Sequence, residues 1–200
     1  MEELIRKLSG KYSEYEIFSD FVILSAMAIA NAVNPCEEYE KRYKHTADKY
    51  NSEELEIFTK SLALLTEELE KDPRDVLGGL YMSMGLGSKS TGQFFTPYHI
   101  CKLMAKTVDF SELKDIRKMT ILEPSCGSGA NVIACYQEAK EQGLFYPGIS
   151  VTAVDLDLKA VCMAFVQFSL LGISAKVSQG NTLELKTNLT LYTPFWNEKR

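Results

Sequence analysis

The stretch that decides the fold is "ILEPSCGSGANVIACYQEAK", residues 121–140. It begins with a short apolar run, continues into a turn that contains Gly127 and Gly129, and ends in a segment with the amphipathic pattern of a helix. Glycines in such a turn let the backbone pass close to a ligand, and the start of the helix offers free N–H groups. The stretch therefore predicts a strand, a binding loop and a helix.

Strands and helices alternate around this loop. The pattern predicts strands in "RKMTIL", "ISVTAVDL" and "ISAKVSQ", and helices in "GANVIACYQEAKEQG" and "DLKAVCMAFVQFSLLG". Such alternation is typical of right-handed βαβ units, in which helices cover the faces of a parallel sheet. We therefore expect an α/β fold, with a Rossmann-like sheet of three to four strands in residues 89–200.

The first part of the chain, residues 1–88, is predicted to form a helical N-terminal region. One helix covers residues 15–33 and ends before Pro35, and a second begins within "CEEYEKRYKHTADKY". A third follows "YNSEEL", with Asn51 or Ser52 as its N-cap. A fourth lies in "KDPRDVLGGLYMSMG", for which we expect Asp72 as the cap and Pro73 as the first helical residue; "GLGSKSTG" is then a connector.

Composition excludes several classes of protein. The net charge of −5 over 200 residues argues against a chain that grips nucleic acid alone through a basic surface, although binding through a partner stays open. The five cysteines show no C-x-x-C spacing, which indicates reduced thiols in a cytoplasmic protein rather than a disulfide framework or a zinc site. Only two histidines are present, so we expect no histidine-based metal centre.

No membrane segment is expected. The start "MEELIRKLSG" lacks the apolar core of a signal peptide, and the apolar run Phe21–Ala30 is too short to span a bilayer.

Two acidic residues indicate what the glycine turn binds. The G-x-G-x-x-G spacing of dinucleotide-binding loops is missing, and Glu123 opens the loop, which suits an ammonium group better than a pyrophosphate. The second strand ends in "VDLD", where Asp155 is placed to accept hydrogen bonds from both hydroxyls of a ribose. Together these features suit S-adenosylmethionine. The alternative is a tight turn that serves packing alone.

At these residues the chain resembles the adenine-N6 DNA methyltransferases, especially the modification subunits of type I restriction systems. "EPSCGSGAN" is similar to the D/E-P-x-x-G-S-G-G loop of that family. "DVLGGLYMSMGLGSKSTGQFFTPYHICKLMAK" precedes the loop as a similar segment does there, and "AVDLDLKAVCMAFVQFSLLGISAKVSQGNTL" follows it. The resemblance covers roughly residues 74–184, in the γ-type motif order, and implies an S-adenosylmethionine-dependent enzyme that acts on DNA.

The resemblance also implies roles for individual residues. Thr96, an N-cap by sequence, would bond the carboxylate of the cofactor, and Glu123 would accept from its ammonium group. Asn181 stands where the family has Asp and would recognise the adenine amine of the cofactor; the alternative is a polar turn after a strand. The implied cofactor-binding residues are Phe95, Thr96, Pro97, Glu123, Ser125, Gly127, Gly129, Asp155 and Asn181.

The catalytic D/N-P-P-Y/F tetrad of the family has only one candidate here, Tyr192-Thr193-Pro194-Phe195. Only Pro194 and Phe195 match the pattern, so they are weak catalytic candidates, and we predict that a working tetrad is missing. The segment "YTPFW" is then an apolar stretch that packs on the sheet or on a partner.

The expected sheet is also incomplete beside that of a whole methyltransferase of the family. An unfinished parallel sheet exposes an edge and an apolar face, so we expect a homodimer or a heteromeric complex, with DNA bound only together with a partner subunit. Three functions remain open: an adenine-N6 DNA methyltransferase of a restriction-modification system, a catalytically silent relative that binds the cofactor and acts through association, and a small-molecule methyltransferase.

Overall fold

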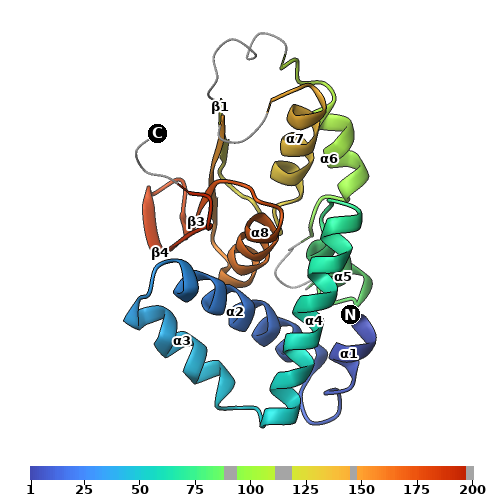
Figure 1. Ribbon diagram of the computed structural model, residues 1–200, viewed down its shortest axis with the longest axis vertical. Coiled ribbons are helices and arrows are strands. Elements are labelled where there is room, and N and C mark those ends of the chain that lie inside the picture. Colours follow the sequence, from blue (N-terminus) through green and yellow to red (C-terminus); the bar gives the residue numbers. More distant parts are fainter. Residues whose placement is uncertain (88–93, 111–118, 145–147, 197–200) are drawn as a thin grey trace.

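The computed structural model describes residues 1–87, 94–110, 119–144 and 148–196 (Figure 1). The start of "GQFFTP" and most of the connector before it fall outside the described residues. The helices are α1 Glu2–Arg6, α2 Glu14–Val33, α3 Glu37–Ala47, α4 Ser52–Lys71, α5 Val76–Ser83, α6 Tyr98–Ala105, α7 Ala130–Glu141 and α8 Leu158–Leu170. The strands are β1 Met119–Glu123, β2 Ile149–Asp155, β3 Ala175–Asn181 and β4 Lys186–Tyr192.

The four described strands form one sheet in the order β1-β2-β3-β4. The α/β class and the strand number are confirmed, and β1, β2 and β3 are parallel as expected. The expectation of an entirely parallel sheet is wrong at β4, which pairs with β3 in the antiparallel direction. Only residues 182–185 separate these two strands, and a parallel return would need a crossover of a dozen or more residues.

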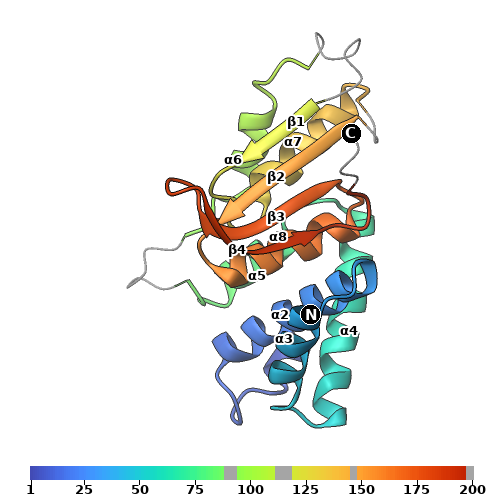
Figure 2. The same ribbon diagram turned by 90° about the vertical axis from the view of Figure 1, so that its left-hand side faces the viewer.

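Both crossover helices lie on the same face of the sheet. Because β1, β2 and β3 are neighbours in chain order and crossovers are right-handed, α7 and α8 are carried to one side. The inward residues Val151, Ala153 and Val177 are fully buried. Figure 2 turns the other face toward the viewer, and there the described helices leave the strands uncovered. The sequence predicts helices on both faces of the sheet. The described part of the fold instead has a helix layer on one face only.

The N-terminal helices pack against the helix layer and the β4 edge of the sheet (Figures 1 and 2). Tyr39 of α3 donates a hydrogen bond of 2.7 Å to the carbonyl of Thr190 in β4. One hydrophobic core runs from Ile5 in α1 to Leu191 in β4. The helical region and the sheet thus share their interior, and a domain boundary at residue 88 stays a prediction.

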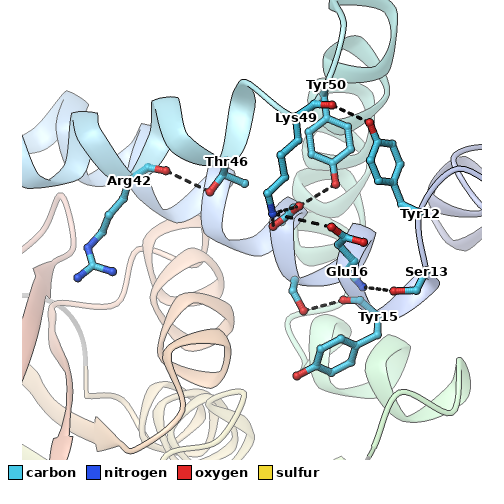
Figure 3. A network of polar contacts seen from close by, with 10 residues as sticks. Tyr12, Ser13, Tyr15, Glu16, Arg42, Thr46, Lys49 and Tyr50 are labelled. Atoms are coloured by element: carbon cyan, nitrogen blue, oxygen red, sulfur yellow. Dashed lines mark hydrogen bonds and ion pairs between the residues drawn. The ribbon is translucent and has the colours of Figure 1, made fainter.

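A buried carboxylate ties the N-terminal helices together (Figure 3). Asp20 of α2 accepts from the ammonium of Lys49 at 3.0 Å and from the hydroxyl of Tyr50 at 2.8 Å. Burial and the neighbouring carboxylate raise the pKa of Tyr50, so its hydroxyl stays a donor. Tyr12 also reaches this corner and donates to the carbonyl of Lys49 at 2.6 Å. The connection between α3 and α4 is therefore pinned to α2.

The helix α2 is 20 residues long, so it is long and apolar enough to cross a membrane by length and composition. The sequence predicts that the run Phe21–Ala30 is too short to span a bilayer, but this run is only part of the helix. The length of α2 therefore does not exclude a membrane span. Phe18 and Phe21 are fully buried, and Asp20 is paired inside the protein. These contacts are those of an inner helix of a globular core.

One helix start agrees with the sequence prediction and one differs from it. Asn51, one of the two cap residues that the sequence offered, caps α4 in a reciprocal capping box with Glu54. Asp72 instead follows the end of α4 in an extended conformation, which the next residue, a proline, favours. Asp75 is the cap of α5 and accepts from the N–H of Gly78 at 2.9 Å.

Candidate functional site

A cavity of about 950 Å³ opens at the carboxyl ends of β1 and β2. Its wall is built from the glycine loop, from the end of β2 and the start of α8, and from residues 94–96. Tyr15 of α2 and Tyr81 of α5 complete it from the helical region. Ligands of α/β sheets bind at this end of the strands, and the volume lies in the range of small-molecule sites.

The glycine loop has a conformation that only glycine adopts without strain. Gly127 has a φ of 53° and Gly129 a φ of 96°. A Cβ on Gly127 would lie 2.9 Å from the ring of Phe95, and one on Gly129 would lie 2.6 Å from the ring of Phe168. Gly127 therefore lets Phe95 approach the loop in the cavity wall, whereas Gly129 lets the loop pack on α8.

Asp155 and the glycine loop meet in this cavity, as the sequence predicted. One carboxylate oxygen of Asp155 accepts from the N–H of Gly127 at 2.8 Å, and the other accepts from the N–H of Asp157 at 2.9 Å. These bonds fix the direction of the carboxylate. Each oxygen keeps a second lone pair, so two further hydroxyl donors can bind.

A buried polar cluster stands behind the loop, formed by Asp75, Ser128 and Gln167. The hydroxyl of Ser128 donates to Asp75 at 2.6 Å, and the amide of Gln167 donates to Asp75 and to the carbonyl of Ser128, both at 2.9 Å. The amide oxygen of Gln167 accepts from the N–H groups of Val76 and Leu77. The start of α5, the glycine loop and α8 are therefore locked together without a cation.

The segment before α6 contributes Phe95 and Thr96 to the wall. The ring of Phe95 lies 5.2 Å from that of Tyr81, which supports it from behind. The helix was predicted to start at Pro97 with Thr96 as its cap, and this is wrong by one residue. Pro97 is extended, with ψ at 133°, so α6 begins at Tyr98 and Pro97 takes the cap position.

Of three further predicted cofactor residues, one lies in the cavity wall and two lie outside it. Ser125 lines the cavity, and its N–H donates to Glu123 at 3.1 Å, but Glu123 is not in the wall. Asn181 is also outside the wall, and its side chain accepts from the N–H groups of Leu183 and Glu184. Its side chain therefore forms a polar turn, the alternative that the sequence left open.

The two catalytic candidates lie at the opposite end of the sheet. Because β4 is antiparallel, residues 193–195 follow it at the amino ends of the parallel strands. Thr193 is buried there, where it accepts from the N–H of Ala175 at 2.9 Å and donates to the carbonyl of Ile173 at 2.7 Å. Phe195 lies near Gly172. The structure does not bring Pro194 and Phe195 to the cavity.

Sequence reasoning missed a clasp at the mouth of the cavity. Lys159 donates to the hydroxyl of Tyr15 at 2.5 Å and pairs with Asp157 at 3.1 Å. Burial alone would lower the pKa of Lys159, but Tyr15 and Asp157 outweigh it and the pKa is raised. No local signal could have found this clasp, since 144 residues separate Tyr15 from Lys159.

Asn131 and Cys126 also line the cavity, and neither was assigned to the cofactor site from the sequence. Asn131 had a weak signal, because it is a polar residue in the apolar first turn of α7. Cys126 also lines the cavity, but burial raises its pKa well above the ordinary value. It remains a thiol, which agrees with a packing role rather than that of a nucleophile.

Comparisons with known proteins agree with this geometry. The family model described as N-6 DNA methylase matches residues 74–193. Among solved structures, the chain is similar to one described as a class I S-adenosylmethionine-dependent methyltransferase from Listeria monocytogenes, with a TM-score of 0.51 and 15% identity. The match covers 94% of this chain and 53% of that one, so this chain spans about half the length of the solved structure. No curated protein matches the chain.

Proposed function

This chain belongs to the N-6 DNA methylase family, and on that premise we propose that it binds S-adenosylmethionine and serves the methylation of adenine N6 in DNA. The family implies S-adenosylmethionine as the cofactor. The observation that carries the proposal is the meeting of Asp155 and the glycine loop in one cavity.

The residues of the cavity fit this cofactor. Asp155 would accept from the ribose hydroxyls, since both of its oxygens are already oriented by backbone N–H groups. Phe95 closes on the loop because Gly127 has no side chain, and this makes a cradle for the flat and apolar parts of the ligand. Thr96 and Ser125 line the wall near the helix starts and would face the amino-acid end. When bound, the cofactor supplies a methyl group on a positively charged sulfur.

Transfer to adenine in DNA is proposed to need a partner. The described cavity contains no D/N-P-P-Y/F tetrad, and a net charge of −5 gives poor affinity for DNA. Among the described residues, β1 pairs only with β2, and its outer edge is the place where a further strand could add. Leu103 and Met104 of α6 are 63% and 51% exposed, which supports an interface on this side.

We place the chain with the modification subunits of restriction-modification systems, working in the cytoplasm as a homodimer or in a heteromeric complex. The motif order and the segment around Phe95 and Thr96 support this over a small-molecule methyltransferase. In the cytoplasm, the five cysteines, all of them free, would stay reduced.

A second function, that of a catalytically silent cofactor-binding relative, is favoured by one observation. The nearest match to the tetrad, residues 192–195, lies at the end of the sheet away from the cavity. In that case the chain would act through association and would not transfer the methyl group itself.

One experiment separates the two functions. The purified chain is titrated with S-adenosylmethionine by calorimetry and incubated with the tritiated cofactor and adenine-rich DNA, with Asp155→Ala as the negative control. Because transfer is proposed to need a partner, the assay is run with the chain alone and again with any partner that the pulldown recovers. Transfer to DNA in either case supports the enzyme, and binding without transfer in both cases supports the silent relative. Failure of the wild-type chain to bind the cofactor would overturn both.

Association is tested by light scattering after size exclusion and by pulldown with the tagged chain. We expect a dimer or a heteromeric complex. A monodisperse monomer that recovers no partner would contradict the proposed assembly while leaving cofactor binding open.

A further inference from the structure

Among the described residues that line the cavity, Asn131 has a buried side-chain atom without a hydrogen-bond partner. The amide oxygen of Asn131 is buried, and no hydrogen-bond partner reaches it from the described part of the chain. A buried acceptor that lacks a donor is destabilising, so its place in a cavity wall calls for an explanation, and a bound ligand is one. Asn131 lines the cavity directly after the glycine loop.

The position of Asn131 tells which part of a ligand it would meet. Its neighbour Ala130 packs against Cys101 of α6 in a small apolar cluster. Thr96, which precedes α6, lines the same cavity. Asp155 and Lys159 come from the β2–α8 side. Asn131 therefore belongs to the α6 side of the cavity and Asp155 to the other.

No described residue supplies the donor that this amide oxygen lacks, so a ligand in the cavity is the source that we test. Asp155 is placed for the ribose, so the other end of the cofactor, with its ammonium and carboxylate groups, extends toward α6. The acceptor that the sequence assigned to the ammonium group, Glu123, is not in the cavity wall and accepts from the N–H of Ser125. On this side, the buried acceptor of the described wall that lacks a partner is the amide oxygen of Asn131.

We propose that Asn131 is a specificity-determining residue whose amide oxygen accepts a hydrogen bond from the ammonium group of S-adenosylmethionine. This inference rests on the proposed cofactor and assigns the recognition of its amino-acid end. A hydrogen bond with a charged partner contributes more than a neutral one, so its loss should be visible in the affinity.

The test compares three ligands by calorimetry. S-adenosylmethionine and S-adenosylhomocysteine both carry the amino-acid end, and 5′-methylthioadenosine lacks it. In Asn131→Leu, which keeps the size of the side chain and removes its polar atoms, we expect the first two to bind about tenfold more weakly, as for the loss of about 1.4 kcal/mol. The affinity for 5′-methylthioadenosine should change less than about twofold.

Two controls keep the result interpretable. Asn188→Leu makes the same change at an exposed site on β4, away from the cavity, and should leave all three affinities unchanged. Asn131→Ala repeats the test in case the leucine distorts the loop. Binding of 5′-methylthioadenosine with wild-type affinity shows that the variant is folded.

Each other outcome overturns the inference. Equal losses for all three ligands would mean that Asn131 shapes the loop and does not recognise the amino-acid end. Unchanged affinities would mean that it has no contact with the ligand. If the wild-type chain binds none of the three, the proposed function fails first, and this differs from a failure of the variant alone.

Discussion

Asp155 and Gly127 are joined by a hydrogen bond of 2.8 Å between a carboxylate oxygen and a backbone nitrogen, although 28 residues separate them in the chain. The side chain proposed to hold the ribose therefore also holds the loop that faces the rest of the ligand. A change at Asp155 should act on both.

Asp155→Ala should reduce the affinity for S-adenosylmethionine by at least about 100-fold. The substitution removes two bonds to a charged acceptor, each of about 1.5–3 kcal/mol, and frees the loop. The fold should persist, with a midpoint of thermal unfolding a few degrees lower. Calorimetry and thermal unfolding measure the two effects. Asp48→Ala, at an exposed position after α3, is the control, and equal affinities in both variants would show that the ribose is held elsewhere.

Gly127→Ala should weaken cofactor binding more than Gly172→Ala does. Both glycines have positive φ, 53° and 71°, so both variants carry a similar backbone strain. Only at Gly127 would the new methyl meet the ring of Phe95 at 2.9 Å; at Gly172 the nearest atom is 3.7 Å away. We expect similar losses of stability, of about 1 kcal/mol or more, and a loss of affinity at Gly127 alone. Denaturation in urea measures the stabilities and calorimetry the affinities. Similar affinities in the two variants would contradict a role for the approach of Phe95 to Gly127 in cofactor binding.

Asp75→Asn should lower the free energy of unfolding by about 2–3 kcal/mol. The carboxylate of Asp75 accepts from Gly78, Ser128 and Gln167 in a buried place, and an amide presents one donor where three donors converge. Asp72→Asn is the matched control, because the Asp72 side chain is 72% exposed and its ion pair with Arg74 contributes little. Urea denaturation gives both values, and a loss as small as that of the control would contradict the role of the cluster.

The protein should lose stability at alkaline pH through its buried thiols. Burial raises the pKa of Cys162 to about 12 and that of Cys101 to about 11, from an ordinary value of 9.0 for a cysteine thiol. The unfolded chain therefore releases these protons first, so the stabilising contribution is complete below pH 9 and declines as the pH rises toward the folded values. For Cys162 the slope is about 1.4 kcal/mol per pH unit. Cys162→Ser should reduce the slope between pH 9 and 11 by about this amount, and identical slopes would refute the assignment.

Local signals predicted much of the fold. The capping box of Asn51 and Glu54 spans three residues, and the alternation of Ile149–Asp155 is that of a strand with one buried side. β4 was not identified as a strand of the sheet, because the first half of Lys186–Tyr192 is polar and exposed and β4 lies at the edge of the described sheet. Its direction follows from the short turn before it rather than from its own residues.

Site residues could be predicted from the sequence where their position depends on a single loop or on the end of a single strand. Gly127 and Asp155 follow from the positions of two strands, and the structure places them together. Asp75 could not be found this way, since its partners Ser128 and Gln167 lie 53 and 92 residues further along the chain. Asn181 follows a strand as the family motif requires, but nearby N–H groups satisfy its side chain.

Because both crossover helices lie on one side, one face of this sheet is buried and the other faces solvent. The solvent-facing side carries the hydroxyls of Thr120, Ser150 and Thr152 and the ammonium group of Lys176, and Thr120 and Ser150 lie within 3.3 Å of each other. It also carries Leu122, which is 68% exposed and lies beside Thr152. A third layer laid over it would have to strip water from these groups and offer each a new partner. The larger assembly proposed above would therefore form more easily at the edge of the sheet, in the plane of the strands.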